Sequence, residues 1–259
     1  MKKLKNIKFP KIKRPLKLVL FGVVMFSLIG FVERNQLDKL CNNIMVTIDN
    51  QLENHFINEQ DIIALITDNG NKQIIGAPLH KLPLKTIEQE VMSHKYVENA
   101  EVYKDLKGNL VVKVMQNRPI ARIVRPYAPD AYISHHGEIL PVSDRYTARV
   151  IIVRGQLSDR FIEEGLTQQN RGKNLFELLL YLQEKPLWHA QIAELELDRL
   201  GNITMYPQIG KQEIYFGKAE NFAAKFKKLD IFFKQILPYK GWNHYQKVNV
   251  NFKNQIICE

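Results

Sequence analysis

The sequence predicts an α+β protein: one N-terminal transmembrane helix, a small domain ordered strand, helix, helix, strand, strand, and then a mainly antiparallel β-domain with helices. Three observations indicate this class. An uncharged apolar run follows a basic tail. Within residues 44–118 the spacing of apolar residues changes between the two-residue period of a strand and the roughly 3.6-residue period of a helix. In residues 119–259, short alternating strands separated by glycine turns recur.

The predicted membrane anchor is residues 18–32, which carry no charge and follow a tail, residues 1–17, whose ionisable side chains are all basic. As a helix the run covers about 22 Å, short of the roughly 30 Å bilayer core, and the stem of Lys17 can extend it. The positive-inside rule then predicts a cytoplasmic N-terminus and export of everything after Glu33. A cleaved signal peptide is the alternative, but Leu28–Val32 offers no small-residue cleavage site.

The net charge of +10 comes almost entirely from the tail, because the remaining residues are close to neutral. A basic overall charge is therefore explained by topology, and no nucleic-acid partner is expected. The two cysteines, Cys41 and Cys258, allow one disulfide, but nothing in their spacing favours it.

The small domain begins after a polar stalk, residues 33–43, which we expect to continue the anchor helix. The alternation in Ile44–Asp49 predicts a strand. Asn58 is an N-cap candidate for the first helix, and Gly70 is its natural stop.

The second helix of this domain is predicted from Thr86 and Gln89, which have the spacing of a capping box, with His94 and Lys95 in its last turn. Two antiparallel strands, Val97–Lys104 and Asn109–Arg118, follow. The small domain therefore spans residues 44–118, and residues 119–259 form the second domain.

Pro119 and Pro126, with Pro129, mark the junction to the second domain, and its meander has turns at Gly201-Asn202 and Gly210. A long amphipathic helix follows, whose aromatic stripe, including Phe226, is predicted as core, and Pro238 and Gly241 end it. The other predicted elements are strands at Tyr132–Ser134, Gly137–Leu140, Val150–Arg154, Ile192–Leu197, Ile203–Tyr206 and Glu213–Phe216, and a helix at Asn174–Leu182.

The last predicted strand has Val248, Val250 and Phe252 on one face and polar residues, beginning with Lys247, on the other. An ordinary closing strand has the same pattern. The residues alone therefore leave open whether this strand is structural or binds a partner.

Several short motifs together resemble the FtsQ family, called DivIB in some bacteria, from the anchor to the last residue. Those in the small domain resemble a POTRA domain. The motifs are Phe56–Ile62 (FINEQDI), Val97–Val102 (VENAEV), Gln116–Arg122 (QNRPIAR), Gly137–Pro141 (GEILP), Tyr146–Val150 (YTARV), Gly241-Trp242 and Asn254–Cys258 (NQIIC).

The resemblance implies that an open sheet edge at the end of the β-domain receives a strand of FtsB, with its companion FtsL. Strand addition uses main-chain hydrogen bonds along an exposed edge. We expect this edge within Lys247–Ile257, with the N–H of Val250 as one donor. For the POTRA domain the resemblance implies contacts with other division proteins, and Asn109–Arg118 is the element to test. The expected partner-binding residues are Trp242, Tyr245, Lys247, Val248, Val250, Phe252, Gln255 and Ile256.

The sequence contains no motif that supports catalysis, such as G-x-S-x-G, a Walker loop or H-E-x-x-H. The best metal candidate, His135-His136, has no third ligand nearby in sequence and is predicted as a surface turn. Ser143-Asp144 is predicted as a turn as well. We expect no catalytic residue, no metal and no cofactor.

The expected function is a non-enzymatic, single-pass inner-membrane scaffold at the division septum, with its bulk in the periplasm, linking early and late septum-assembly proteins. Two alternatives remain. A TonB-like transducer would need a long Pro-rich spacer, and an anchored periplasmic hydrolase would need clustered catalytic groups.

Overall fold

The computed structural model describes residues 21–27, 39–49, 55–166 and 170–259. Residues 21–27 are helical, and the other residues of the predicted anchor and tail lie outside the described ranges. Within those ranges no helix combines the length and the apolar character that crossing a bilayer requires. The chain divides into two compact units; the second consists of residues 48–58, 92–99 and 114–259, and the first of the rest.

A three-stranded sheet with the order β1-β3-β2 lies in the predicted small domain. The predicted order of strand, helix, helix, strand, strand is confirmed, with a short 3-10 turn, η1, between the helices. The elements are β1 (Ile44–Asp49), α2 (Glu59–Ile66), η1 (Leu79–Lys81), α3 (Leu84–Met92), β2 (Val97–Lys104) and β3 (Leu110–Gln116).

The predicted helical stalk is wrong for residues 39–43, and residues 33–38 lie outside the described ranges. Leu40 forms an isolated antiparallel bridge with Pro78. The N–H of Cys41 donates to the Ala77 carbonyl over 2.8 Å, and the Cys41 carbonyl accepts from the Gly76 N–H over 2.7 Å. Cys41 is buried. The segment is extended because the loop around Gly76 offers it backbone partners, which no local pattern reveals.

Helix α2 begins directly after Asn58, as predicted, whereas its end and the start of α3 differ from those predicted. Helix α2 ends before Gly70 because Asp68 and Asn69 already adopt left-handed φ angles of 48° and 54°. Helix α3 begins at Leu84, so Thr86 is not a cap, and the Pro83 carbonyl accepts the Thr86 N–H over 3.0 Å. Residues 94 and 95 follow the helix, which ends at Met92.

The second unit contains a nine-stranded sheet with the order β12-β11-β10-β9-β8-β7-β4-β5-β6. Three neighbouring pairs are parallel, β4·β7, β7·β8 and β10·β11, and the others are antiparallel. The strands are β4 (Pro119–Ile123), β5 (Ala131–Ser134), β6 (Ile139–Pro141), β7 (Ile151–Gly155), β8 (Ile192–Leu197), β9 (Ile203–Pro207), β10 (Glu213–Gly217), β11 (Lys247–Asn249) and β12 (Ile257–Cys258).

The α+β class is confirmed, and the second unit contains two strands, β4 and β12, and two short helices that the sequence patterns did not predict. Strand β4 was missed because Pro119 indicated a junction, whereas proline is tolerated as the first residue of a strand. The missed helices are α4 (Ser158–Glu164) and α6 (Pro186–Gln191).

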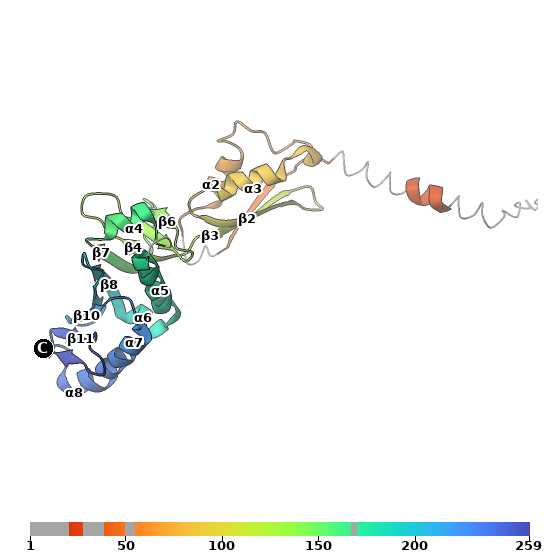
Figure 1. Ribbon diagram of the computed structural model, residues 1–259. Helices are drawn as coiled ribbons and strands as arrows, with labels where there is room; N and C mark the ends of the chain where they lie inside the picture. The colour runs from red at the N-terminus through yellow and green to blue at the C-terminus, as the bar shows by residue number, and fades with distance from the viewer. Residues whose placement is uncertain (1–20, 28–38, 50–54, 167–169) are drawn as a thin grey trace, which may run out of the picture. The chain divides into compact units, whose positions relative to one another are not determined.

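Helices α5 (Asn170–Glu184), α6 and α7 (Phe222–Ile231) lie along one side of strands β7 to β11 (Figure 1). The core lies between these two layers. A row of paired residues crosses the sheet from β8 to β11, and all of its side chains are fully buried: Leu195, Met205, Ile214 and Val248. The prediction that the apolar stripe of the long helix is core is confirmed: Phe226, Leu229 and Leu237 are buried, and Phe222, Phe233 and Ile236 are partly buried and pack against the core.

The long C-terminal helix changes character along its length. Helix α7 continues into a π-helical segment, η2 (Phe232–Ile236), and then into α8 (Leu237–Lys240). Pro238 lies inside α8, so the prediction that it ends the helix is wrong; the π-helical turn just before it relaxes the normal i→i−4 ladder. Gly241, with φ of 99°, ends the helix as predicted.

Tyr96 gives the second unit a measurable pH dependence. Its hydroxyl donates to the Pro141 carbonyl over 2.5 Å, and burial, with the nearby Tyr132 and Asp144, raises the pKa of Tyr96 to about 12. The folded state therefore holds this proton more tightly than the unfolded state. Stability should be full below about pH 10 and fall as the pH rises from 10 to 12, by about 2–3 kcal/mol at most.

We expect Tyr96→Phe to flatten this alkaline loss in urea unfolding at pH 9 and pH 11. Tyr127→Phe is the matched control, because Tyr127 is fully exposed. If both variants lose as much stability between the two pH values as the wild type, Tyr96 is not the titrating group.

Candidate partner interface

The end of the nine-stranded sheet is formed by β11 and β12, and β12 is the outermost strand. Strand β11 pairs in parallel with β10 on one side and antiparallel with β12 on the other. Lys247 and Glu259 exchange two backbone hydrogen bonds, of 3.0 and 2.9 Å. These two residues are therefore a hydrogen-bonded pair of the antiparallel ladder.

The next pair along this ladder is Val248 with Cys258. In an antiparallel ladder hydrogen-bonded and non-hydrogen-bonded pairs alternate, so the N–H and C=O of Cys258 point away from β11, toward the open edge. The side chain of Cys258 lies on the same face of the sheet as Val248 and packs against the core. Cys258 thus offers its backbone, rather than its thiol, to an incoming strand.

The predicted edge is displaced by one strand. Lys247–Asn249 lies between two strands, and the Val250 N–H donates to the Tyr215 carbonyl over 3.1 Å. Val250 is therefore no edge donor, which corrects that expectation. Val248 and Val250 are 0 % exposed and belong to the core, so neither side chain is available to a partner. The alternation of apolar and polar residues therefore predicted correctly which side chains are buried, but it did not indicate which strand is outermost.

The turn between β11 and β12 is held by helix α7. The ammonium of Lys228 donates to the carbonyls of Val250 and Phe252, the latter over 2.7 Å. Asn249 Oδ1 accepts the Asn251 N–H over 3.0 Å, which tightens the start of the turn. Asn254 has a left-handed φ of 59°. These contacts fix the path of the chain into β12.

The other predicted partner residues lie in two places. Phe252, Gln255 and Ile256 line a groove with α7, whereas Trp242 and Tyr245 lie in the loop before β11. The backbone carbonyl of Trp242 accepts from the Nε2 of buried Gln212, and its ring lies 6.4 Å from that of Phe233. Tyr245 is half-buried, with its ring 6.2 Å from that of Phe232. Lys247 is exposed on β11.

The groove beside the edge has a volume of about 1060 Å³. One wall is helix α7 with the loop before it, and the other is the β11–β12 turn. Lys225 and Lys228 of α7 line it, and sequence analysis did not select either residue. The sequence does contain one indication of β12: the polar pair Lys253-Asn254 separates two apolar segments, as a turn between two strands would. A turn at this position would also have indicated the groove beside it.

The candidate metal ligands, His135 and His136, lie outside the groove. His135 and His136 form a turn, and His136 Nε2 lies 2.9 Å from Glu98 Oε1. Across the described ranges, no three His, Cys, Asp or Glu side chains gather as a metal site would require. Cys41 and Cys258 are both free thiols.

The element of the small domain selected for a partner test lies in the middle of its sheet. Asn109–Arg118 contains β3, the central strand, whose backbone pairs with β1 and β2. The open edges of this sheet are β1 and β2, so strand addition is available there and not at β3.

Two family models match the chain. The model described as FtsQ/DivIB, C-terminal related, matches residues 118–259, and the POTRA-like domain matches residues 39–115. Among curated proteins no match is found. The family is generally a non-enzymatic cell-division scaffold. Because the first model covers more than half of the chain, and a POTRA-like domain precedes it as in the resemblance noted above, the protein belongs to the FtsQ/DivIB family.

Proposed function

We propose that this protein is a non-enzymatic, single-pass inner-membrane scaffold of the bacterial division machinery, and that the open edge of β12 binds a periplasmic strand of FtsB, accompanied by FtsL. Membership of the FtsQ/DivIB family supports the division role. The observation that carries the proposal is the outward-facing backbone of Cys258 at the end of the sheet.

The proposed topology rests on the sequence. The basic tail stays in the cytoplasm, residues 18–32 span the inner membrane, and both domains lie in the periplasm at the septum. The POTRA-like domain offers a second surface to other division proteins, through the open edge of β2. The chain thereby links proteins that arrive early at the septum with those that arrive late.

The first test is binding of the full-length protein, in nanodiscs of zwitterionic lipid, to a fluorescent peptide from the periplasmic part of the same organism's FtsB. We expect saturable binding, and markedly weaker binding of a scrambled peptide of equal composition, which keeps the charge but not the order of side chains along the strand. Equal binding of both peptides would overturn the proposal.

Localisation of a fluorescent fusion separates this function from the two alternatives. A division scaffold gathers at midcell in dividing cells, whereas a TonB-like transducer or an anchored hydrolase has no reason to do so. Uniform labelling of the cell envelope would contradict the division role.

A further inference from the structure

We propose that the groove between α7 and the β11–β12 turn binds an acidic segment of the same polypeptide whose strand pairs with β12. This inference rests on the proposed function, and it adds the charge of the partner and the side chains that select it.

The groove is strongly basic. Five lysines line it against one carboxylate, that of Glu220. Within the described ranges none of the five ammonium groups has a carboxylate within ion-pair distance. The lysines are Lys218, Lys225, Lys227, Lys228 and Lys253.

Two of these charges are held in place where water is partly excluded. Lys225 is only 7 % exposed; its ammonium donates to the Lys218 carbonyl over 2.8 Å and lies 4.8 Å from the centre of the Phe216 ring. Lys228 is fixed by the carbonyls of Val250 and Phe252. Burial lowers the pKa of both lysines, and the charge of Lys228 lowers that of Lys225 further, an effect that the carboxylate of Glu220 opposes in part. Positive charges kept together in this way favour an incoming anion.

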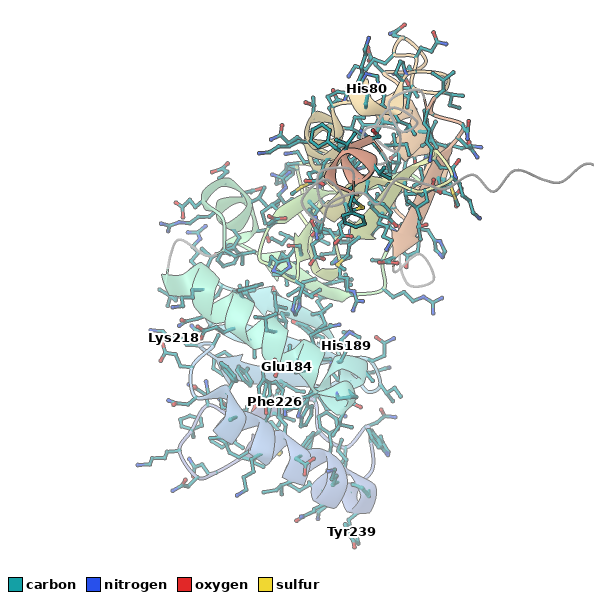
Figure 2. The ribbon with its side chains drawn as sticks, turned by 90° about the vertical axis from the view of Figure 1, so that its right-hand side faces the viewer. His80, Glu184, His189, Lys218, Phe226 and Tyr239 are labelled. Carbon is teal, nitrogen blue, oxygen red and sulfur yellow. The ribbon has the colours of Figure 1, made fainter. Side chains whose placement is uncertain are left out.

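The rim of the groove suits an extended peptide. Three of the lysines, Lys218, Lys227 and Lys253, are exposed. Figure 2 shows Lys218 reaching away from the body of the domain. Side-chain amides line the same groove and can donate to carboxylates or to a peptide backbone: Asn202, Asn221, Asn251, Asn254 and Gln255.

Continuity with the sheet edge identifies the occupant. The turn that forms one wall of the groove, residues 251–256, leads directly into β12. A strand added to β12 therefore runs past the groove, and its flanking residues can enter it. A segment with several Asp or Glu residues beside an apolar strand is the chemistry that fits both features.

The groove is tested with fluorescein-labelled pentaglutamate and full-length protein in zwitterionic nanodiscs at low salt. We expect the triple variant Lys218→Glu, Lys227→Glu, Lys253→Glu to bind roughly tenfold more weakly than the wild type. The matched control reverses three exposed lysines outside the groove: Lys173→Glu, Lys185→Glu, Lys211→Glu. It should change the affinity less than twofold, and the basic tail contributes equally to every variant.

If both triple variants lose affinity for pentaglutamate equally, the peptide responds only to the net charge of the protein, and the proposal that it binds in the groove is overturned. Groove-dependent binding of phosphatidylglycerol vesicles without binding of pentaglutamate would overturn it as well, because the occupant would then be lipid. The variant Cys258→Pro separates this inference from the proposed function: it should still bind pentaglutamate while losing the FtsB peptide. If the groove triple variant binds the FtsB peptide as well as the wild type does, the groove inference fails and the edge proposal stands.

Discussion

Replacing Cys258 with proline should weaken binding of the FtsB peptide by at least about tenfold. The substitution removes the outward N–H of the edge strand, and one backbone hydrogen bond contributes about 1 kcal/mol net, before any steric effect of the ring on the incoming strand. Because this N–H points away from β11, the fold keeps its internal ladder. The measurement is fluorescence anisotropy with the labelled peptide.

The matched control is Cys258→Ser, which keeps the N–H and changes only the thiol. It should bind like the wild type, and both variants should unfold at the same temperature as the wild type within a few degrees. If the serine variant loses as much affinity as the proline variant, the thiol rather than the backbone contacts the partner.

Replacing Phe226 with alanine should destabilise the second unit by about 3–5 kcal/mol. Phe226 is 1 % exposed, and its ring centroid lies 4.9 Å from Trp188, 5.1 Å from Tyr181 and 5.3 Å from Phe216. Figure 2 shows it directed from α7 toward the helix that carries Glu184. The side chain therefore joins α5, α6, α7 and β10, and its loss leaves a cavity that aromatic neighbours cannot close.

Urea unfolding followed by circular dichroism measures this loss. Tyr239→Ala is the control: Tyr239 is exposed at the end of α8 and should change stability by less than about 0.5 kcal/mol. Phe226→Ala should also weaken partner binding, since α7 holds the turn into β12 through Lys228. A loss below about 1 kcal/mol would show that Phe226 is not central to the core.

The elements that the sequence predicts correctly are those with a local pattern. Alternation is enough to place β1 and β3, and the helical spacing of apolar residues places α7 and its buried stripe. The resemblance to the FtsQ family is likewise carried by short motifs and is confirmed by the family models.

The missed features depend on partners that are distant in sequence. Cys41 is extended because it pairs with the loop at Gly76 and Ala77, which alternation cannot report. For the interface, alternation at Val248 and Val250 indicates burial but not which strand is outermost. That position belongs to β12, whose two residues are too few to give a periodic signal. The sequence therefore locates the interface within a few residues and assigns the wrong backbone groups to it.

The central claim, that β12 is an open edge which receives a partner strand, is tested most directly by amide hydrogen exchange. Exchange is followed by NMR at Cys258 and Ile257 in the full-length protein, with and without saturating FtsB peptide. The Ile257 amide faces β11 and should be protected in both states. The Cys258 amide should exchange rapidly in the free protein and become protected in the complex. Rapid exchange at Cys258 in a saturated complex would contradict strand addition at this edge.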